Sequence, residues 1–329
     1  MEKIDILLAT YNGEKYLKEQ LDSILSQTYS EFRLIISDDC SSDNTRQILE
    51  EYEKKDSRIK LYYQEKNLGY VKNFEFLLEK VENEIYCLSD QDDVWNIDKL
   101  EKTYNKLKDT NSDLVFTDLE VVNENLETIL PSFNDYMLLS RKIRKYKTDY
   151  RMQYLYNCIT GCTIISKKQF INKIIPIPTQ SKYVIHDTWI GLIVSLYGKI
   201  DYLDEKTIKY RQHGNNQVGT DKLSHKFNKL QDVRDLFIDV KLNLFETYVL
   251  NNHIFGNELK KQNKETLEYF KMIKNKKYIN FRKWSVFHNL YKTETIKFYI
   301  ENFMILNMPL VTNIPFRLRH LILKAIGKR

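Results

Sequence analysis

The sequence predicts an α/β protein with a mostly parallel central sheet flanked by helices, followed by a helical C-terminal extension. Over the first 118 residues, short apolar runs alternate with longer segments in which apolar residues recur every three or four positions. This alternation is typical of repeated βαβ units. Beyond about residue 221 the pattern is helical throughout. We therefore expect a domain of residues 1–220 and an extension of residues 221–329.

Five short apolar runs predict the strands. In chain order they are residues 4–9, 32–37, 59–63, 85–88 and 114–117. Four segments of helical period separate them, at residues 16–25, 45–54, 74–81 and 97–108. Because a helix of about ten residues stands between consecutive strands, the strands are expected to run parallel.

Polar loops follow three of these strands, at residues 10–13, 38–43 and 90–93. In open parallel sheets, ligands bind outside the carboxyl ends of the strands, so the topology predicts that these loops converge. No G-x-G-x-x-G follows the first strand, and no G-x-x-x-x-G-K-[ST] occurs in the sequence. Dinucleotide-binding and P-loop interpretations therefore lose their main support.

The third loop is an acidic turn in which Asp90, Asp92 and Asp93 place three carboxylates within four residues. These carboxylates repel one another unless a positive charge lies among them. A divalent cation with oxygen ligands supplies that charge and can in turn hold a phosphate. The alternative is a solvated turn that caps the following helix.

Composition limits the class of protein. The chain has 329 residues and a hydrophobic content of 42%, enough for a substantial core. Among its four cysteines, Cys158 and Cys162 have no second Cys or His pair that would complete a zinc site, so reduced, buried thiols are expected rather than disulfides or metal ligands. Reduced thiols and the lack of an apolar signal segment at the N-terminus favour a cytoplasmic location. No apolar stretch reaches the roughly 18 residues of a spanning helix.

The net charge of +6 is concentrated near the C-terminus. Residues 281–329 contain nine Lys and Arg against two Glu, interspersed with Trp, Phe and Leu. Such a composition suits a helix in the interface of an anionic membrane, which predicts peripheral attachment to the inner face of the plasma membrane. The alternative is a helical appendage that packs on the first domain or on another subunit. No nucleic-acid partner is expected, because no recognised nucleic-acid-binding fold accompanies the charge.

A family resemblance rests on an ordered series of motifs. The motifs are Ala9-Thr10-Tyr11-Asn12-Gly13, Ser37-Asp38-Asp39-Cys40-Ser41-Ser42-Asp43, Asn67-Leu68-Gly69 and Ser89-Asp90-Gln91-Asp92-Asp93. The series resembles the inverting family 2 glycosyltransferases, which have a GT-A fold. Within that family, three segments are similar to bacterial rhamnosyltransferases: Tyr11-Asn12-Gly13-Glu14-Lys15-Tyr16-Leu17, Asp90-Gln91-Asp92-Asp93-Val94-Trp95 and Tyr210-Arg211-Gln212-His213-Gly214-Asn215-Asn216.

The resemblance implies a site for a nucleotide-sugar donor. Thr10, Tyr11 and Asn12 would line the nucleotide, and Asn67 belongs to the same set. Asp39, with Asp38 beside it, would accept a hydrogen bond from the ring N–H of uracil or thymine. For these two aspartates the alternative is a locally stabilised Asx-type turn.

The resemblance also assigns the sugar and metal contacts. Asp92 would ligate the cation, while Asp90 would touch the donor sugar or ribose, and Asp93 is a reserve ligand or a helix cap. Gly161 would let the backbone approach the donor sugar and the acceptor, although a small residue at this position can also serve packing.

The catalytic base is expected at Asp187, where the family has an E-D motif. His186 stands in the place of the usual acidic neighbour, which puts in doubt any role that needs a negative charge there. A carboxylate at 187 would take the proton of the acceptor hydroxyl, and its alternative is a helix N-cap. Arg211 would reach the diphosphate and His213 the metal, unless they lie in an ordinary exposed loop.

These expectations combine into one function. The chain would be a glycosyltransferase that uses Mn²⁺ or Mg²⁺ to move a sugar, L-rhamnose from dTDP-L-rhamnose, to a saccharide acceptor in bacterial surface polysaccharide synthesis. That acceptor can be lipid-linked. One alternative is the same fold acting on a UDP-hexose. The other is a catalytically inactive module that binds a sugar nucleotide or a polysaccharide.

Overall fold

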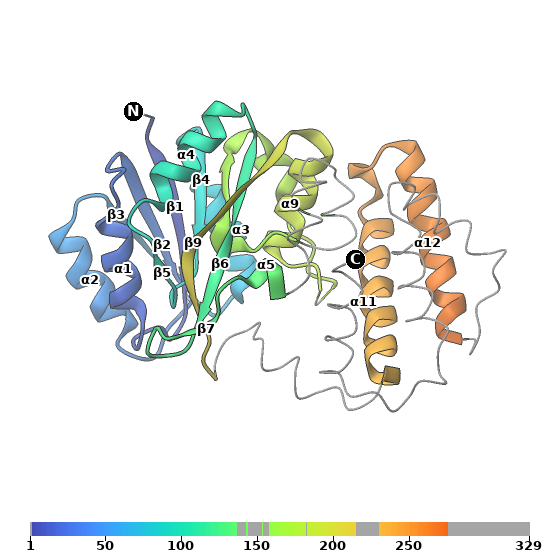
Figure 1. Ribbon diagram of the computed structural model, residues 1–329, viewed down its shortest axis with the longest axis horizontal. Helices are drawn as coiled ribbons and strands as arrows, with labels where there is room; N and C mark the ends of the chain where they lie inside the picture. Colours follow the sequence, from blue (N-terminus) through green and yellow to red (C-terminus); the bar gives the residue numbers. More distant parts are fainter. Residues whose placement is uncertain are drawn as a thin grey trace. The chain divides into compact units, whose positions relative to one another are not determined.

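We describe the fold from a computed structural model of the chain (Figure 1). The structure describes residues 2–136, 143, 153, 158–181, 183–214 and 230–275. The chain divides into two compact units, Met1–Thr179 with Ile185–Asn216, and Gln180–Val184 with Gln217–Arg329. Each unit is described by itself, and the domain boundary between residues 220 and 221 stays a prediction.

The first unit is built on one sheet whose strands follow the order β3-β2-β1-β4-β8-β6-β9-β5, with β7 paired to β6. The strands are β1 (Ile4–Thr10), β2 (Phe32–Asp38), β3 (Ile59–Tyr63), β4 (Ile85–Ser89), β5 (Val94–Trp95), β6 (Leu114–Val122), β7 (Thr128–Leu130), β8 (Ile165–Lys167) and β9 (Ile200–Arg211). The first four pair in parallel, as do β6 and β9. The remaining pairs, which involve β5, β7 and β8, are antiparallel. The predicted α/β sheet is confirmed.

The unit's helices are α1 (Leu17–Leu25), α2 (Thr45–Lys55), α3 (Tyr70–Glu79), α4 (Lys99–Asp109), α5 (Phe133–Tyr136), α8 (Ile171–Ile174) and α9 (His186–Tyr197), and short 3-10 turns lie at η1 (Gly161–Thr163) and η2 (Lys168–Phe170). Alternate residues of β1, such as Ile6 and Leu8, share a buried cluster with Leu21 of α1 and Leu100 of α4. Leu7 points to the other face and is also fully buried, and α3 contacts β1 and β2. Burial on both faces explains why the strands are continuous apolar runs.

The strand register fixes where the polar loops lie. Thr10 pairs with Asp38 across β1 and β2, and Leu8 pairs with Ser89 across β1 and β4. The three strands therefore end at one edge of the sheet, and the loops that follow them meet there. This is the convergence that the alternation of strands and helices predicts.

Three predicted elements have other boundaries in the structure. The third helix, expected at residues 74–81, spans Tyr70–Glu79. The fifth predicted strand, residues 114–117, continues to Val122 in β6, so Asp118 lies inside a strand. Asp118 is nevertheless satisfied, because its carboxylate accepts hydrogen bonds from Ser132 Oγ (2.5 Å) and Asn134 N (3.1 Å). The helix expected from residue 97 begins at Lys99.

In the second unit, α11 (Leu230–Leu250) and α12 (Asn257–Asn275) pack against each other, with η3 (Asn252–Ile254) between them. Phe245 and Phe270 stack with a centroid distance of 6.1 Å, and Lys274 Nζ lies 3.0 Å from Asp239 Oδ1. Among the described residues, no helix has the length and apolar content needed to cross a bilayer.

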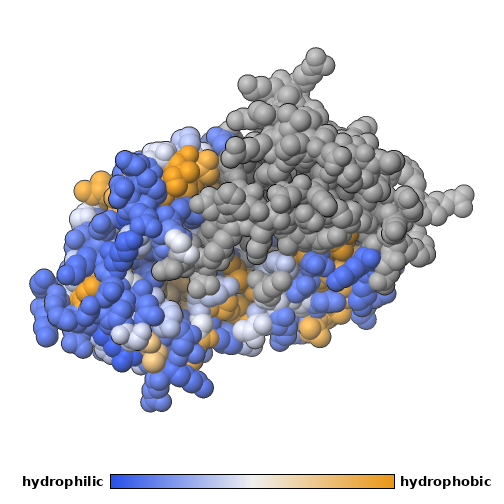
Figure 2. Space-filling model, turned by 90° about the horizontal axis from the view of Figure 1, so that it is seen from below, coloured by the Kyte–Doolittle hydropathy of each residue, from blue (hydrophilic) through white to orange (hydrophobic). Residues whose placement is uncertain are grey.

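The basic, aromatic segment at residues 281–329 lies outside the described residues. Its predicted attachment to a membrane therefore stays a prediction. On the face that Figure 2 shows, the described side chains are mostly hydrophilic, and apolar side chains gather only in small separate patches.

Candidate active site

The acidic turn is tied to the end of β1 through Gln91. The Gln91 side-chain oxygen accepts hydrogen bonds from Thr10 Oγ1 (2.6 Å) and from the backbone N–H of Tyr11 (2.8 Å), and Gln91 Nε2 donates to the carbonyl of Tyr11 (3.1 Å). Gln91 thus holds two predicted nucleotide-binding residues against the turn. The sequence analysis assigned it no role, although its place between the aspartates was a usable signal.

Position 13 is a glycine because the Gln91 side chain of the acidic turn lies close to its backbone. A Cβ at Gly13 would lie 2.4 Å from Gln91 Oε1, so any other residue would push the amide away. Asn12 adopts a positive φ of 48°, its backbone N–H donates to Ser41 Oγ (2.9 Å), and its side-chain oxygen accepts from Ser42 N (2.9 Å). The loops after β1 and β2 are therefore fastened to each other.

Asp38, the last residue of β2, and Asp39, which follows it, are both buried but have different partners. Asp38 accepts from Ser41 N (3.1 Å) and from Arg46 Nε (2.8 Å). Asp39 accepts from the backbone N–H groups of Leu68 (2.6 Å) and Gly69 (2.9 Å).

Asn67 sits in the same loop as the partners of Asp39. Its side-chain oxygen accepts from Gly69 N (3.0 Å), and Gly69 has a positive φ of 79°. Asp39 therefore orders the Asn67-Leu68-Gly69 segment, and its predicted contact with a pyrimidine would be additional to these bonds.

Charge repulsion is strong within the turn. Burial, followed by the charges of Asp92 and Asp187, raises the pKa of Asp90 to about 7. Burial and the neighbouring Asp92 and Asp90 also raise the pKa of Asp93 well above its usual value. Such a turn gains stability from an added cation.

Asp92 pairs with His213. The distance from His213 Nε2 to Asp92 Oδ2 is 2.8 Å, and the His213 ring lies 4.8 Å from the ring of Tyr16. An imidazole nitrogen and a carboxylate oxygen side by side are a donor set that divalent transition-metal ions accept. The two predicted metal ligands, which are 121 positions apart in sequence, are brought together.

Arg211 is almost fully buried and bonds the backbone of the acidic turn. Its Nε donates to the carbonyl of Asp92 (2.9 Å), one terminal nitrogen donates to the carbonyl of Glu124 (2.6 Å), and the other pairs with the Glu19 carboxylate. Its guanidinium also lies 4.5 Å from the centroid of the Tyr16 ring. These bonds hold the backbone of the turn, and the predicted contact of Arg211 with a diphosphate stays a prediction.

Asp187 lies in the first turn of α9, where the helix N-terminus favours a carboxylate. It accepts hydrogen bonds from Thr188 N (2.5 Å), from Thr188 Oγ1 (3.2 Å) and from Gly161 N (3.2 Å). Burial raises the pKa of Asp187 to about 6, although these hydrogen bonds oppose the rise. Asp187 and Asp90 are close enough for their charges to interact. A carboxylate with this pKa can serve as a general base near neutral pH.

His186 is neutral in this environment. Its ring stacks on Phe74 at a centroid distance of 4.0 Å and meets the edge of Tyr70 at 6.1 Å. Burial lowers the pKa of His186 to about 3. A Cβ at Gly161 would lie 2.9 Å from His186 Nε2, so Gly161 makes room for this ring as well as bonding Asp187.

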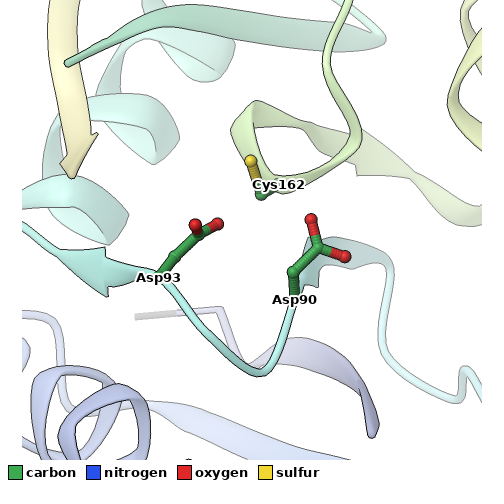
Figure 3. Close-up of side chains that lie close together, drawn as sticks. All are labelled: Asp90, Asp93 and Cys162. Atoms are coloured by element: carbon green, nitrogen blue, oxygen red, sulfur yellow. The ribbon is translucent and has the colours of Figure 1, made fainter. Parts of the chain in front are cut away.

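Two aspartates of the acidic turn also lie close to a cysteine from another part of the chain. Ligand atoms of Asp90, Asp93 and Cys162 all lie within 4.8 Å of one another (Figure 3). Cys162 comes from η1 and is buried, as expected for a reduced thiol. Sequence reasoning did not connect it with the turn, because the contact spans about 70 positions.

The comparisons with known proteins identify the family. The model of the family described as "Glycosyl transferase family 2" matches residues 5–172. The chain is 30% identical over 267 residues to the dTDP-rhamnosyl transferase RfbG of Shigella flexneri, an alignment that covers 77% of this chain and 88% of that protein. It is 28% identical over 170 residues to the Escherichia coli UDP-Glc:alpha-D-GlcNAc-diphosphoundecaprenol beta-1,3-glucosyltransferase WfgD, covering 51% and 62%.

Solved structures show the same fold. The structure of S. aureus TarS 1-349 in complex with UDP-GlcNAc superposes with a TM-score of 0.55 at 22% identity, covering 82% of this chain and 71% of that one. The mannosyltransferase PcManGT from Pyrobaculum calidifontis, in complex with GDP-Man and Mn2+, gives a TM-score of 0.51 at 13% identity, covering 98% and 86%. The chain therefore belongs to glycosyl transferase family 2, has the GT-A fold, and is a glycosyltransferase.

Proposed function

We propose that this glycosyltransferase moves L-rhamnose from dTDP-L-rhamnose to a saccharide acceptor with inversion at the anomeric carbon, in the synthesis of a bacterial surface polysaccharide. The observation that carries the proposed reaction is Asp187, a buried carboxylate with a raised pKa that is close enough to the acidic turn for its charge to act on Asp90. The similarity to a dTDP-rhamnosyl transferase over most of both chains supports the choice of donor.

The loops after β1 and β2 would hold the nucleotide. Thr10, Tyr11 and Asn12 lie at the edge where the strands end, and Tyr11 is exposed there. Asp39 has oxygens held by backbone N–H groups and would use a remaining lone pair for the ring N–H of thymine or uracil. A pyrimidine-specific donor is the consequence, because cytosine has no ring proton to give.

Asp92 and His213 fit a divalent cation, because a carboxylate oxygen and an imidazole nitrogen already lie 2.8 Å apart. When bound there, Mn²⁺ or Mg²⁺ would neutralise charge that develops on the leaving diphosphate. Asp90, with a pKa of about 7, would contact the donor sugar or ribose.

Asp187 would perform the proton transfer. Its carboxylate accepts the proton of the acceptor hydroxyl as that oxygen forms a bond to the anomeric carbon, and the bond from that carbon to the diphosphate oxygen breaks. Direct displacement with one base inverts the anomeric configuration. The N–H of Gly161 and the N–H of Thr188 hold the carboxylate in place for this step.

The acceptor would be a growing saccharide, and we propose that it is lipid-linked. Under this proposal the basic, aromatic segment at residues 281–329 binds the anionic inner face of the plasma membrane, where such an acceptor is found. Flotation with anionic vesicles tests this part, since a chain that ends near residue 280 should lose binding. Undiminished binding of the shortened chain to the vesicles would show that residues 281–329 are not what attaches the protein to the membrane.

A donor panel tests the main proposal. The protein is incubated with dTDP-L-rhamnose, UDP-glucose or UDP-GlcNAc, with Mn²⁺ or Mg²⁺, and release of nucleoside diphosphate is measured. We expect slow release from dTDP-L-rhamnose and its loss in Asp92→Asn. The matched control is Asp98→Asn, an aspartate that pairs with Lys102 on the surface.

The panel also separates the alternatives. Preferential release from a UDP-sugar would favour the second candidate, which the fold shared with a UDP-GlcNAc complex supports. If no donor is cleaved and no nucleotide raises the melting temperature, both enzymatic candidates fail and a polysaccharide-binding role remains to be tested.

A further inference from the structure

We propose that Asp90, Asp93 and Cys162 form a binding site for a thiophilic divalent ion such as Zn²⁺. This ligand set differs from the pair of Asp92 and His213, to which we assign the catalytic cation. Occupation of the proposed site would inhibit the enzyme.

The three side chains converge from two parts of the chain. Asp90 and Asp93 stand at the two ends of the turn after β4, and Cys162 projects from η1. Figure 3 shows all three around one common space. Their ligand atoms lie within 4.8 Å of one another. Tetrahedral zinc, with Zn–S of about 2.3 Å and Zn–O of about 2.1 Å, places such atoms about 3.4–3.6 Å apart. Movement of the ligand atoms by about 1 Å would bring them to these separations, and a water molecule would take the fourth tetrahedral position.

A second observation points to a ligand. Asp93 is fully buried, and among the residues that the structure describes its Oδ2 has no hydrogen-bond partner of normal geometry. The other oxygen of this carboxyl, Oδ1, accepts from the backbone N–H of Arg211 (3.3 Å), and the carboxyl also interacts with the thiol of Cys162, which is a weak donor. A buried carboxylate oxygen without a strong donor is costly, and a cation in the common space would satisfy it.

The chemistry of the donor set selects the ion. Thiolate sulfur favours Zn²⁺ and other soft ions over Mg²⁺ and Mn²⁺, which prefer oxygen. The thiol of Cys162 loses its proton to water as the metal–sulfur bond forms. Lys99 is buried nearby, with its Nζ 3.6 Å from the centroid of the Trp95 ring, and its charge interacts with Asp93 and Cys162. The positive charge of this lysine favours the thiolate form of Cys162, because it opposes the burial that raises the pKa of this thiol.

Inhibition follows from the double use of Asp90. Under the proposed function Asp90 contacts the donor, so an ion that draws its carboxylate toward Cys162 removes that contact. Zn²⁺ should therefore raise the KM for the donor more than it lowers kcat. The binding itself does not depend on the proposed function.

Cobalt tests the binding directly. The full-length apo-protein is titrated with Co²⁺, and sulfur-to-cobalt charge-transfer absorption is recorded in the near ultraviolet. We expect this band in the wild type, its loss in Cys162→Ala, and its displacement by Zn²⁺. Cys158→Ala is the matched control, because Cys158 is also a buried thiol four positions away. Absence of the band in the wild type, or its persistence in Cys162→Ala, would overturn the proposal.

A measurement without any variant guards against a Cys162→Ala protein that does not fold. Zinc X-ray absorption fine structure on the wild-type complex should show one sulfur neighbour at about 2.3 Å. A shell of nitrogen and oxygen alone would contradict the site. In the donor assay, Cys162→Ala should raise the half-inhibitory Zn²⁺ concentration, relative to its own activity, at least about tenfold. A thiolate band in a protein that cleaves no donor would refute the proposed function and leave the zinc site standing.

Discussion

Gly161 donates its backbone N–H to Asp187 Oδ2 at 3.2 Å, and this bond joins η1 to the first turn of α9. A buried carboxylate with one oxygen held by Gly161 and the other by Thr188 has a fixed orientation. The same glycine leaves space for the neutral ring of His186. Gly161 therefore constrains both His186 and Asp187, the two residues at which the family has its acidic pair.

Replacing the proposed base should abolish transfer and leave donor binding intact. We expect Asp187→Asn to lower kcat about 10²- to 10⁴-fold, because a positioned base contributes that much. Isothermal titration with the nucleotide should show an unchanged dissociation constant. Asp109→Asn, on the surface at the end of α4, is the control. A variant with more than a tenth of wild-type activity would contradict the assignment.

Transfer should depend on pH through Asp187. Its pKa is raised to about 6 by burial, and only the deprotonated form takes a proton. Activity should therefore be low at pH 5, rise through about pH 6 and level off above it. The measurement is kcat/KM for the acceptor at saturating metal. The residual activity of Asp187→Asn should lack this acidic limb, and an identical limb in the variant would assign the titration to another group.

The contact between Gly13 and Gln91 should appear as energetic coupling. Gly13→Ala places a methyl group 2.4 Å from the amide oxygen that Thr10 and Tyr11 share, so it should weaken donor binding. Gln91→Ala removes the same bonds. In the double variant the two losses should not add, with a coupling of about 0.5–3 kcal/mol from donor dissociation constants. Strict additivity would mean that the two residues act separately.

Arg211 should matter for stability as well as for activity. Arg211→Lys keeps the charge but loses the planar fork that reaches two carbonyls and Glu19. We expect a loss of unfolding free energy on the order of 3 kcal/mol, because the carbonyls of Asp92 and Glu124 lose the donors of a buried guanidinium. Urea unfolding measures it. Glu19→Gln, which removes only the half-exposed partner, should cost less. Equal losses in the two variants would place most of the stabilisation in the ion pair.

Metal removal should stop the reaction reversibly. Treatment with a chelator should eliminate transfer, and Mn²⁺ or Mg²⁺ should restore it. His213→Ala should raise the metal concentration needed for half-maximal activity by about 10- to 100-fold. Full activity in the chelator would exclude a metal-dependent mechanism.

The sequence was sufficient for the parts of the fold that depend on local pattern. The strands β1 to β4 are apolar runs, and the sequence predicts their bounds to within a residue or two. It also predicts that the polar loops after β1, β2 and β4 lie at one edge of the sheet. In contrast, β5 has two residues and β8 has three, too few to show a period. They form because partners distant in the chain offer free edges.

The candidate site shows the same division. Motifs placed Asp92 and Asp187, but the role of Gln91 depends on a contact across 81 positions and the bonds of Arg211 on contacts across 87 to 192. No local pattern encodes such partners. The assigned roles of the predicted residues in binding and catalysis remain predictions.

The anchoring of the turn by Arg211 has a consequence for dissecting the protein. The family match ends at residue 172, yet Asp187, Arg211 and His213 all follow that point. A fragment cut there would keep the loops after β1, β2 and β4 but would lose the proposed base, one proposed metal ligand and the arginine that bonds the backbone of Asp92. Such a fragment would be a poor stand-in for the enzyme, and any nucleotide affinity it retained would underestimate that of the intact chain.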